Sequence, residues 1–492
     1  MNTNEENQVI DVYRRQWAVL HVNDRFVHDW SVWRLERNNV LYTHPDLTVV
    51  NVEGLEGKYS QIIILGIAFF AENSSGSLAD SFKEKFYRAN GELSKVVIEL
   101  CGTYVVIGAT NASLELYSDP AGMRGVYYND GRAASTPTLL PNAVRDTELD
   151  RCFPLNQTNE WYPGDICPYK GTRALLSNHS LTLETGEIER FWPISVPDLR
   201  SIEDSIVEIA DIMRAMVGAV IRRWSIVCSI TGGKDSRVSV AACRDFIEHV
   251  KFFTVRSSRT EACDIEYPAR LAEQFDLNHR FLDVSTPSAE LLNAYNALTA
   301  GMSIGERARI LNACEQLAGP GVVHLNGNLG AITKRFYWHT ERPTTVRKSS
   351  LLREFYYKPP VVREAINRWF DSLPDVSACM AYNLMYLEQR GGRWMGIGET
   401  GSQLFYDSLS LFNNRRVFEL VCSRQNSSIS RTPLLEHLVR EMWPELLSIP
   451  YCPSTRRWSK MLPLPIRKPM RAVWLSSAMN SIRVRLQDAD QR

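Results

Sequence analysis

The feature that most restricts the fold of this chain is an alternation of strand-like and helix-like segments over residues 225–284. Short apolar segments, rich in β-branched and aromatic residues, alternate there with amphipathic segments of helical period. A β-α-β-α-β order implies parallel strands that pair in one sheet and are covered by helices. The predicted strands are residues 225–230, 250–255 and 280–284, and the predicted helices are residues 201–223, 237–248 and 264–275.

The first part of the chain has a different pattern. Short apolar segments at residues 61–70, 104–107 and 114–117 are separated by Gly, Asn, Asp and Pro, which is typical of antiparallel strands joined by turns. A chain of 492 residues is also too long for one hydrophobic core. We therefore expect an α/β protein with a β-rich domain over residues 1–195 and a parallel-sheet domain over residues 198–480, whose last third is largely helical.

Composition excludes several classes of partner. Lys and Arg total 56 and Asp and Glu total 56, so the balanced charge argues against a nucleic-acid partner. The N-terminus has no basic segment followed by an apolar one, and no apolar run reaches the roughly 18 residues of a membrane span. The ten cysteines are scattered without CxxC spacing, which predicts reduced thiols and a cytoplasmic location.

The sequence SITGGKDSR, residues 229–237, follows the first predicted strand directly. In a parallel sheet this strand-to-helix junction is where ligands bind. Gly232 and Gly233 can take positive φ and let backbone N–H groups approach an anion, and Ser229 and Ser236 can add hydroxyl donors. Asp235 is a hard oxygen ligand suited to Mg²⁺. The alternative is a capped turn, in which Asp235 and Ser236 only satisfy free helix N–H groups.

The end of the next strand is expected beside this loop. Thr254 and Val255 there are candidates to line an adenine slot. The loop itself does not fit the pattern GxxxxGK[ST], because Lys234 is followed by Asp.

With these residues in place, the sequence resembles the asparagine synthetase superfamily, whose ATP-pyrophosphatase loop has the form SGGxDS. Asp264, Ala269, Ala272 and His279 match the stretch that follows the second strand in that family. Leu100, Gly102, Asp119, Gly122, Tyr127 and Tyr128 resemble its β-sandwich amidotransferase domain. The resemblance implies an ATP-binding synthetase domain and ATP with Mg²⁺ as cofactors.

Three departures narrow the expectation. Glutamine-using members carry a nucleophilic Cys after Met1, whereas this chain has Asn2 there and its first cysteine is Cys101. We therefore expect the amidotransferase-like half to be inactive as a glutaminase, which resembles β-lactam synthetase and lasso-peptide cyclase. The loop of residues 323–331 keeps its glycines but has no carboxylate, so Asn326 and Asn328, or Glu399 and Asp407, are the alternatives for the missing metal acid. For the lysine that stabilises developing negative charge, the chain offers Lys460 and then Lys468.

We therefore expect an ATP-dependent ligase that activates a carboxylate as an acyl-adenylate for attack by an amine. Asp235 would hold Mg²⁺, Lys460 would act in catalysis, and the loop would bind pyrophosphate. The substrates would be small-molecule or peptide acids and amines in natural-product or antibiotic biosynthesis, with a homodimer or partner protein as a further possibility. The alternative is a degenerate, non-catalytic module that binds ATP or a partner protein.

Overall fold

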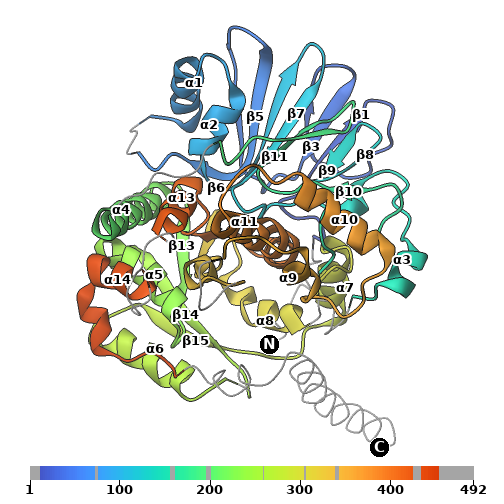
Figure 1. The fold of residues 1–492 in the computed structure, drawn as a ribbon. Coiled ribbons are helices and arrows are strands. Elements are labelled where there is room, and N and C mark those ends of the chain that lie inside the picture. Colours follow the sequence, from blue (N-terminus) through green and yellow to red (C-terminus); the bar gives the residue numbers. More distant parts are fainter. Residues whose placement is uncertain are drawn as a thin grey trace, which may run out of the picture.

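The computed structural model describes residues 11–72, 76–155, 161–194, 201–258, 260–303, 306–337, 343–424 and 434–453. In Figure 1, the strands of the N-terminal half lie at the top, and the parallel sheet with its helices lies below them. The expected α/β class, with antiparallel sheets followed by a parallel sheet and helices, is confirmed.

Two six-stranded antiparallel sheets form the N-terminal half, in the orders β10-β8-β9-β1-β3-β2 and β12-β11-β7-β6-β5-β4. A buried cluster that includes Trp17, Leu41, Ile63 and Val105 lies between them, so the two sheets form a sandwich. The strands are β1 Trp17–His21, β2 Ser31–Arg34, β3 Asn39–Thr43, β4 Val49–Val52, β5 Tyr59–Phe69, β6 Cys101–Thr110, β7 Leu114–Ser118, β8 Tyr127–Asn129, β9 Arg132–Ala134, β10 Arg173–Ala174, β11 His179–Thr182 and β12 Glu187–Arg190.

The uninterrupted apolar sequence of strand β5 is explained by burial of both of its faces. Ile63 and Leu65 face the other sheet, whereas Ile62 and Ile64 face the helices α1 and α2, because successive side chains of a strand point to opposite faces. A strand covered on both faces needs apolar residues at every position. The short helices of this half are α1 Leu78–Arg88, α2 Leu93–Glu99, η1 Pro137–Leu139 and α3 Thr147–Cys152.

The second half contains a five-stranded parallel sheet in the order β15-β14-β13-β16-β17. Its first strands fall within a residue or two of the predicted segments, and β17 was not predicted. The strands are β13 Ser225–Ser229, β14 Val250–Arg256, β15 His279–Asp283, β16 Val322–Asn326 and β17 Asp407–Ser410.

Helices cover both faces of this sheet. Alternate residues of β13 separate the two layers, because Ile226 and Cys228 pack in one buried cluster with α4 and α5, and Val227 packs in another with α7 and α8. The helices are α4 Ile202–Ile221, α5 Lys234–Ala242, η2 Arg244–His249, α6 Cys263–Gln274, α7 Ala289–Leu298, α8 Glu306–Ala313, η3 Glu315–Leu317, η4 Gly330–Lys334, α9 Lys348–Leu352, α10 Pro360–Asp371, α11 Ala378–Leu384, η5 Met385–Met395, α12 Gly396–Ser402, α13 Arg415–Arg424, α14 Leu434–Met442 and η6 Pro444–Ser448.

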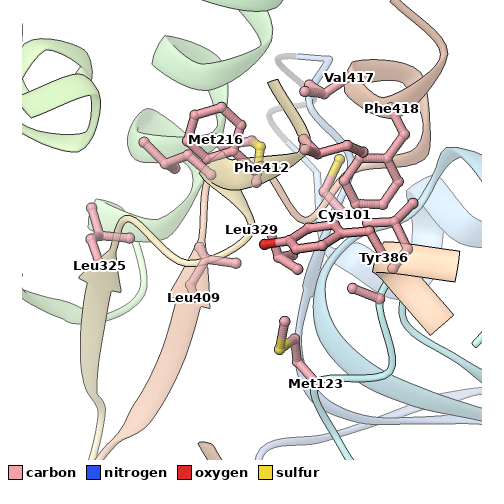
Figure 2. Packing of buried hydrophobic residues seen from close by; sticks show 14 of the residues in the cluster. Cys101, Met123, Met216, Leu325, Leu329, Tyr386, Leu409, Phe412, Val417 and Phe418 are labelled. Atoms are coloured by element: carbon pink, nitrogen blue, oxygen red, sulfur yellow. The ribbon is translucent and has the colours of Figure 1, made fainter. Parts of the chain in front are cut away.

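The two halves share one hydrophobic core. Figure 2 shows Cys101 and Met123 of the N-terminal half beside Leu329, Tyr386 and other side chains of the second half. The domain boundary near residue 195 stays a prediction, but the sandwich and the parallel sheet are packed against each other as one body of buried side chains.

Buried ion pairs also cross this junction. Asp407, at the start of β17, accepts a hydrogen bond of 2.6 Å from Nη2 of Arg124, and its other oxygen lies 3.6 Å from Nε of Arg15. Both arginine side chains are 1% exposed, so this carboxylate is the counter-ion that two buried guanidinium groups share. Asp407 therefore joins the halves of the molecule and is not free to bind a metal.

Candidate functional site

The candidate site lies where the chain order of the parallel sheet reverses. From β13 the chain moves outward through β14 and β15, and it then returns to the other side of β13 to form β16 and β17. The loops at the carboxyl ends of β13 and β16 flank this switch point, which is the place where open α/β sheets bind ligands. The loop after β13 is the TGGKD sequence singled out above, and the loop after β16 is the glycine-containing NGNLG sequence.

The loop after β13 is braced from inside by hydroxyl groups. The backbone N–H of Thr231 donates to Oγ of Ser236 at 3.1 Å, and the two hydroxyl oxygens are 3.0 Å apart. The N–H of Gly233 donates to Oγ1 of Thr231 at 3.1 Å. Ser236 is buried in this structure and braces the loop, and its contact with phosphate stays a prediction.

Neither glycine of this loop has positive φ, and Gly232 is needed for space. Gly233 has φ of −82° as the residue before α5, and Gly232 is not among the residues of positive φ, so that expectation was wrong. A Cβ on Gly232 would lie 2.2 Å from Sγ of Cys452 and 3.0 Å from the carbonyl oxygen of Cys263. No side chain fits between the loop and these cysteines.

Asp235 lies in the first turn of α5 and faces the second loop. Its Oδ2 lies 2.5 Å from Nζ of Lys334. Its Oδ1 is buried and has no hydrogen-bond partner among the described residues. Gly327 and Gly330 of the second loop lie so close that a Cβ on either would be 3.0 Å or less from an atom of Asp235. Glycine at both positions lets the second loop pack against this carboxylate.

The second loop, which follows β16, contacts Glu399 through its asparagine side chains. The side-chain amides of Asn326 and Asn328 both donate to Oε1 of Glu399, and the carbonyl of Asn328 accepts from Oγ of Ser410 at 2.5 Å. Burial raises the pKa of Glu399 above its ordinary value, against the opposing effects of Ser408, Arg307 and Asn328. Asn326, Asn328 and Glu399 are three of the alternatives for the missing metal acid. Their side chains are hydrogen-bonded together, because both amide nitrogens donate to the carboxylate.

A cavity of about 280 Å³ adjoins this loop. Its wall includes Asn328 and Glu399 together with Arg307, Trp394, Leu311 and Tyr406. The guanidinium of Arg307 lies 4.5 Å from the ring centre of Trp394 and donates to its carbonyl oxygen at 3.0 Å. The cavity thus combines a cation, a carboxylate and apolar surface.

The remaining predicted residues lie near the loop in different environments. Thr254 is buried and donates to the carbonyl oxygen of Ile230 at 2.8 Å, so its hydroxyl supports the end of β13. Val255 is half-buried beside Leu282 of β15, and Ser229 ends β13 opposite Phe253. Their proposed contacts with a nucleotide stay predictions.

Two cysteine expectations were tested. Cys101 opens β6, is buried, and has a pKa raised by burial to about 12, so it is no thiolate nucleophile. The expectation that all cysteines are unpaired was wrong, because Cys263 and Cys452 form a disulfide. Their separation of 189 residues gave no motif in the sequence, and only folding brings them together.

The lysine beside the loop after β13 was missed by sequence reasoning. Lys460, predicted to be catalytic, and Lys468 lie outside the described residues. Lys334 is the lysine that reaches Asp235. Lys334 ends the short helix η4, which follows the NGNLG sequence. This position was the sequence signal that could have identified it, because a residue just after a loop at this edge of the sheet returns to the site.

Comparisons with known proteins give only distant matches. No family profile and no curated protein matches the sequence. Among solved structures, an NH₃-dependent NAD synthetase from Campylobacter jejuni matches with 12% identity and a TM-score of 0.19, over 28% of this chain and 62% of that one. A glutamine-dependent NAD⁺ synthetase from Acinetobacter baumannii, in complex with ADP, matches with 11% identity and a TM-score of 0.19, over 44% and 41%.

A third structure covers more of the chain. Glutamine phosphoribosylpyrophosphate amidotransferase from B. subtilis, complexed with ADP and GMP, matches with 11% identity and a TM-score of 0.22, over 72% of this chain and 74% of that one. The chain spans less than two thirds of the two NAD synthetases. Scores this low add no argument to the chain's own topology and site.

Two absences hold for the described parts of the chain. None of their helices is long and apolar enough to cross a bilayer. Within the same residues, no three His, Cys, Asp or Glu side chains gather as a ready-made metal site.

Proposed function

We propose that this protein is an ATP-dependent ligase that activates a carboxylate as an acyl-adenylate and transfers the acyl group to an amine. The observation that carries the proposal is the unsatisfied Oδ1 of Asp235, buried where the loops after β13 and β16 meet. A buried carboxylate oxygen without a donor is costly unless a ligand or ion completes it. The resemblance of SITGGKDSR to a pyrophosphate loop supports ATP at this place, with a cation bound to its phosphates as the group that would complete Oδ1.

The reaction divides into two steps. An oxygen of the substrate carboxylate attacks the α-phosphorus of ATP, and the bond from that phosphorus to the bridging oxygen breaks to release pyrophosphate. The amine then attacks the acyl carbon, AMP leaves, and the ammonium proton passes to a base. Activation is required because a carboxylate is a poor electrophile until its oxygen becomes part of a good leaving group.

The loop after β13 would bind the departing pyrophosphate. The N-terminus of α5 has no side-chain cap and offers an anion-binding edge, and Lys234 adds a positive charge at the first residue of that helix. Lys334 would contribute a second charge, because its ammonium group already lies beside Asp235. Lys460 stays a further candidate.

The residues present fit Mg²⁺ in a limited way. Asp235 supplies one carboxylate with a free oxygen, and Mg²⁺ in nucleotide sites is often bound by one or two carboxylates together with phosphates. When bound, Mg²⁺ would neutralise charge that develops on the phosphates.

The cavity beside the second loop would receive the acid and amine substrates. Arg307 is placed to bind a carboxylate, and the apolar walls suit a hydrocarbon portion. Glu399, with a pKa raised by burial, is suited to accept the proton of the attacking amine. The charges of Arg307 and Glu399 lie on the wall of one cavity. The proposed chemistry therefore fits an acid and an amine that belong to one molecule or to two.

The pattern of phosphate products tests the proposal. Full-length protein is incubated with ATP, Mg²⁺ and pools of amino acids and peptides, and nucleotides are separated by chromatography. We expect AMP and pyrophosphate in equal amounts that depend on an organic substrate. Stoichiometric ADP would exclude an adenylating ligase.

A non-catalytic nucleotide-binding module is the second candidate. It is favoured by the loop of residues 323–331, which has no carboxylate to serve as a second metal ligand. This function would be favoured if the protein bound ATP, in a sample whose site is shown to be accessible, and formed no AMP with any of these substrate pools.

A further inference from the structure

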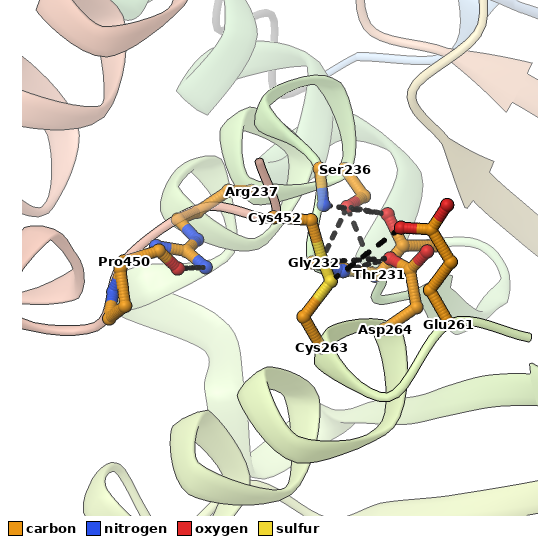
Figure 3. Close-up of a disulfide and its surroundings, with 10 residues drawn as sticks. Thr231, Gly232, Ser236, Arg237, Glu261, Cys263, Asp264, Pro450 and Cys452 are labelled. Atoms are coloured by element: carbon orange, nitrogen blue, oxygen red, sulfur yellow. Dashed lines mark hydrogen bonds between the residues drawn. A yellow bond between two sulfur atoms is a disulfide. The ribbon is translucent and has the colours of Figure 1, made fainter. Parts of the chain in front are cut away.

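The disulfide between Cys263 and Cys452 lies directly on the proposed phosphate loop. Cys263 is the first residue of α6, and Cys452 belongs to the segment that follows η6. Figure 3 shows the two sulfur atoms beside Gly232 and Thr231, between the loop and α6. Both cysteines are half-buried, so the bond is at the surface of the loop and not in the core.

Both backbone groups of Gly232 are engaged at this disulfide. The N–H of Cys452 donates to the carbonyl of Gly232 at 2.9 Å. The N–H of Gly232 donates to Asp264, the neighbour of Cys263, at 2.7 Å. The position that a phosphate oxygen would take at this N–H is therefore occupied by a carboxylate of the chain itself.

The same segment also engages the cations of α5. Arg237 donates to the carbonyl of Pro450 at 3.0 Å, and its guanidinium lies 4.3 Å from the ring centre of Tyr451. Nζ of Lys234 lies 4.8 Å from that ring centre and 3.3 Å from a carboxylate oxygen of Glu436. A phosphate that approaches this helix must compete with both groups for Lys234.

We propose that Cys263 and Cys452 form a thiol–disulfide switch that closes the phosphate loop when oxidised and opens it when reduced. The inference rests on the proposed nucleotide site and adds its regulation. Oxidation holds the segment with Cys452 and the α6 residue Asp264 against Gly232. Reduction removes the covalent tether. A phosphate group with more negative charge than the carboxylate of Asp264 then displaces this carboxylate and the segment.

The chemistry balances with a dithiol as reductant. A thiolate of the dithiol attacks one sulfur of the pair and forms a mixed disulfide, and its second thiol then displaces the protein sulfur. Two electrons and two protons pass to the protein, which gains two thiols, while the dithiol becomes a disulfide. Oxidation by a small disulfide reverses both steps.

The test compares one nucleotide probe on two forms of the full-length protein. The protein is oxidised with glutathione disulfide or reduced with dithiothreitol, and the state of Cys263 and Cys452 is verified by alkylation and mass spectrometry. Affinity for α,β-methylene-ATP with Mg²⁺, which resists cleavage at the relevant bond, is measured by calorimetry. We expect the reduced form to bind about tenfold or more tightly than the oxidised form.

Two variants provide matched controls. The double variant Cys263→Ser/Cys452→Ser is expected to bind as tightly as the reduced protein, with or without dithiothreitol. Cys152→Ser changes an exposed free cysteine and should leave the full redox response intact.

The outcomes separate the switch from the site. Equal affinity of the verified oxidised and reduced wild-type proteins overturns the switch and leaves the nucleotide site standing. Absence of binding in both forms and in the double variant overturns the site and the switch together. A wild-type protein that keeps two free thiols after oxidation also overturns the switch.

Discussion

Nζ of Lys334 lies 2.5 Å from Oδ2 of Asp235, although the two residues are 99 positions apart. The pair joins the loop after β16 to the first turn of α5, at the switch point of the sheet. It leaves one oxygen of Asp235 neutralised and the other without a donor among the described residues. This half-satisfied carboxylate is the basis of the first prediction.

Asp235→Asn should abolish most AMP formation while it preserves the fold. Asparagine keeps the size and can still accept hydrogen bonds, but it lacks the charge that holds a cation. Loss of a contact that acts in the transition state costs about 2.7–4 kcal/mol, or roughly a hundred- to thousand-fold in rate. Rates are measured from substrate-dependent AMP, with Asp245→Asn on the exposed side of η2 as control. A rate equal to that of the wild type would remove Asp235 from the site.

Glu399→Gln should change the pH dependence of the amine step. Burial raises the pKa of Glu399, and a general base works only when deprotonated, so the wild-type rate should fall as the pH drops through this raised pKa. Gln cannot accept the proton, so the variant should be slow and lack this acidic limb. The profile of kcat against pH is measured, with Glu290→Gln on the exposed surface of α7 as control. An unchanged acidic limb in Glu399→Gln would assign the titration to another group.

Asp407→Asn should strongly destabilise the protein without direct effect on nucleotide chemistry. The variant leaves Arg15 and Arg124 buried without their counter-ion, and removal of one partner of a buried pair costs about 3–5 kcal/mol. Urea unfolding measures this loss. Asp283→Asn breaks an exposed pair with Arg256 and should leave the unfolding midpoint nearly unchanged. Equal effects of the two variants would contradict a role for Asp407 in joining the halves.

His324→Phe should flatten the dependence of stability on pH below neutrality. Burial lowers the pKa of His324 from its ordinary 6.5 to about 4, so the folded protein holds it neutral where the unfolded chain is protonated. Between these values the unfolded state binds more protons, and stability falls as pH falls, by at most about 1.4 kcal/mol per pH unit for this group.

The substitution is tolerable because His324 lies between the rings of Phe253 and Tyr406. The free energy of unfolding is measured from pH 7 to pH 4 in both proteins. A slope that stays the same in the variant would show that His324 does not contribute. His279, whose pKa is also lowered to about 4 by burial, contributes in the same direction, as do His28 and His179, whose pKa values burial also lowers, so a residual slope is expected.

The sequence by itself determined the class of fold and the position of the first loop. Periodicity is a local property, so the strand β5 and the alternation from β13 to β15 could be predicted from residues 61–70 and 225–284. The loop at residues 231–235 was recognisable because strand, glycines, acid and helix follow one another directly in the chain.

Tertiary structure decided what surrounds that loop. Lys334 at Asp235, Cys452 at Gly232, and Arg124 at Asp407 are contacts across 99, 220 and 283 positions, and no local pattern encodes their partners. The same reason explains why Asp407 could not be separated from Glu399 as a candidate ligand. A carboxylate has the same identity in the sequence whether it neutralises a buried arginine or lines a cavity, and only packing decides which charge it meets.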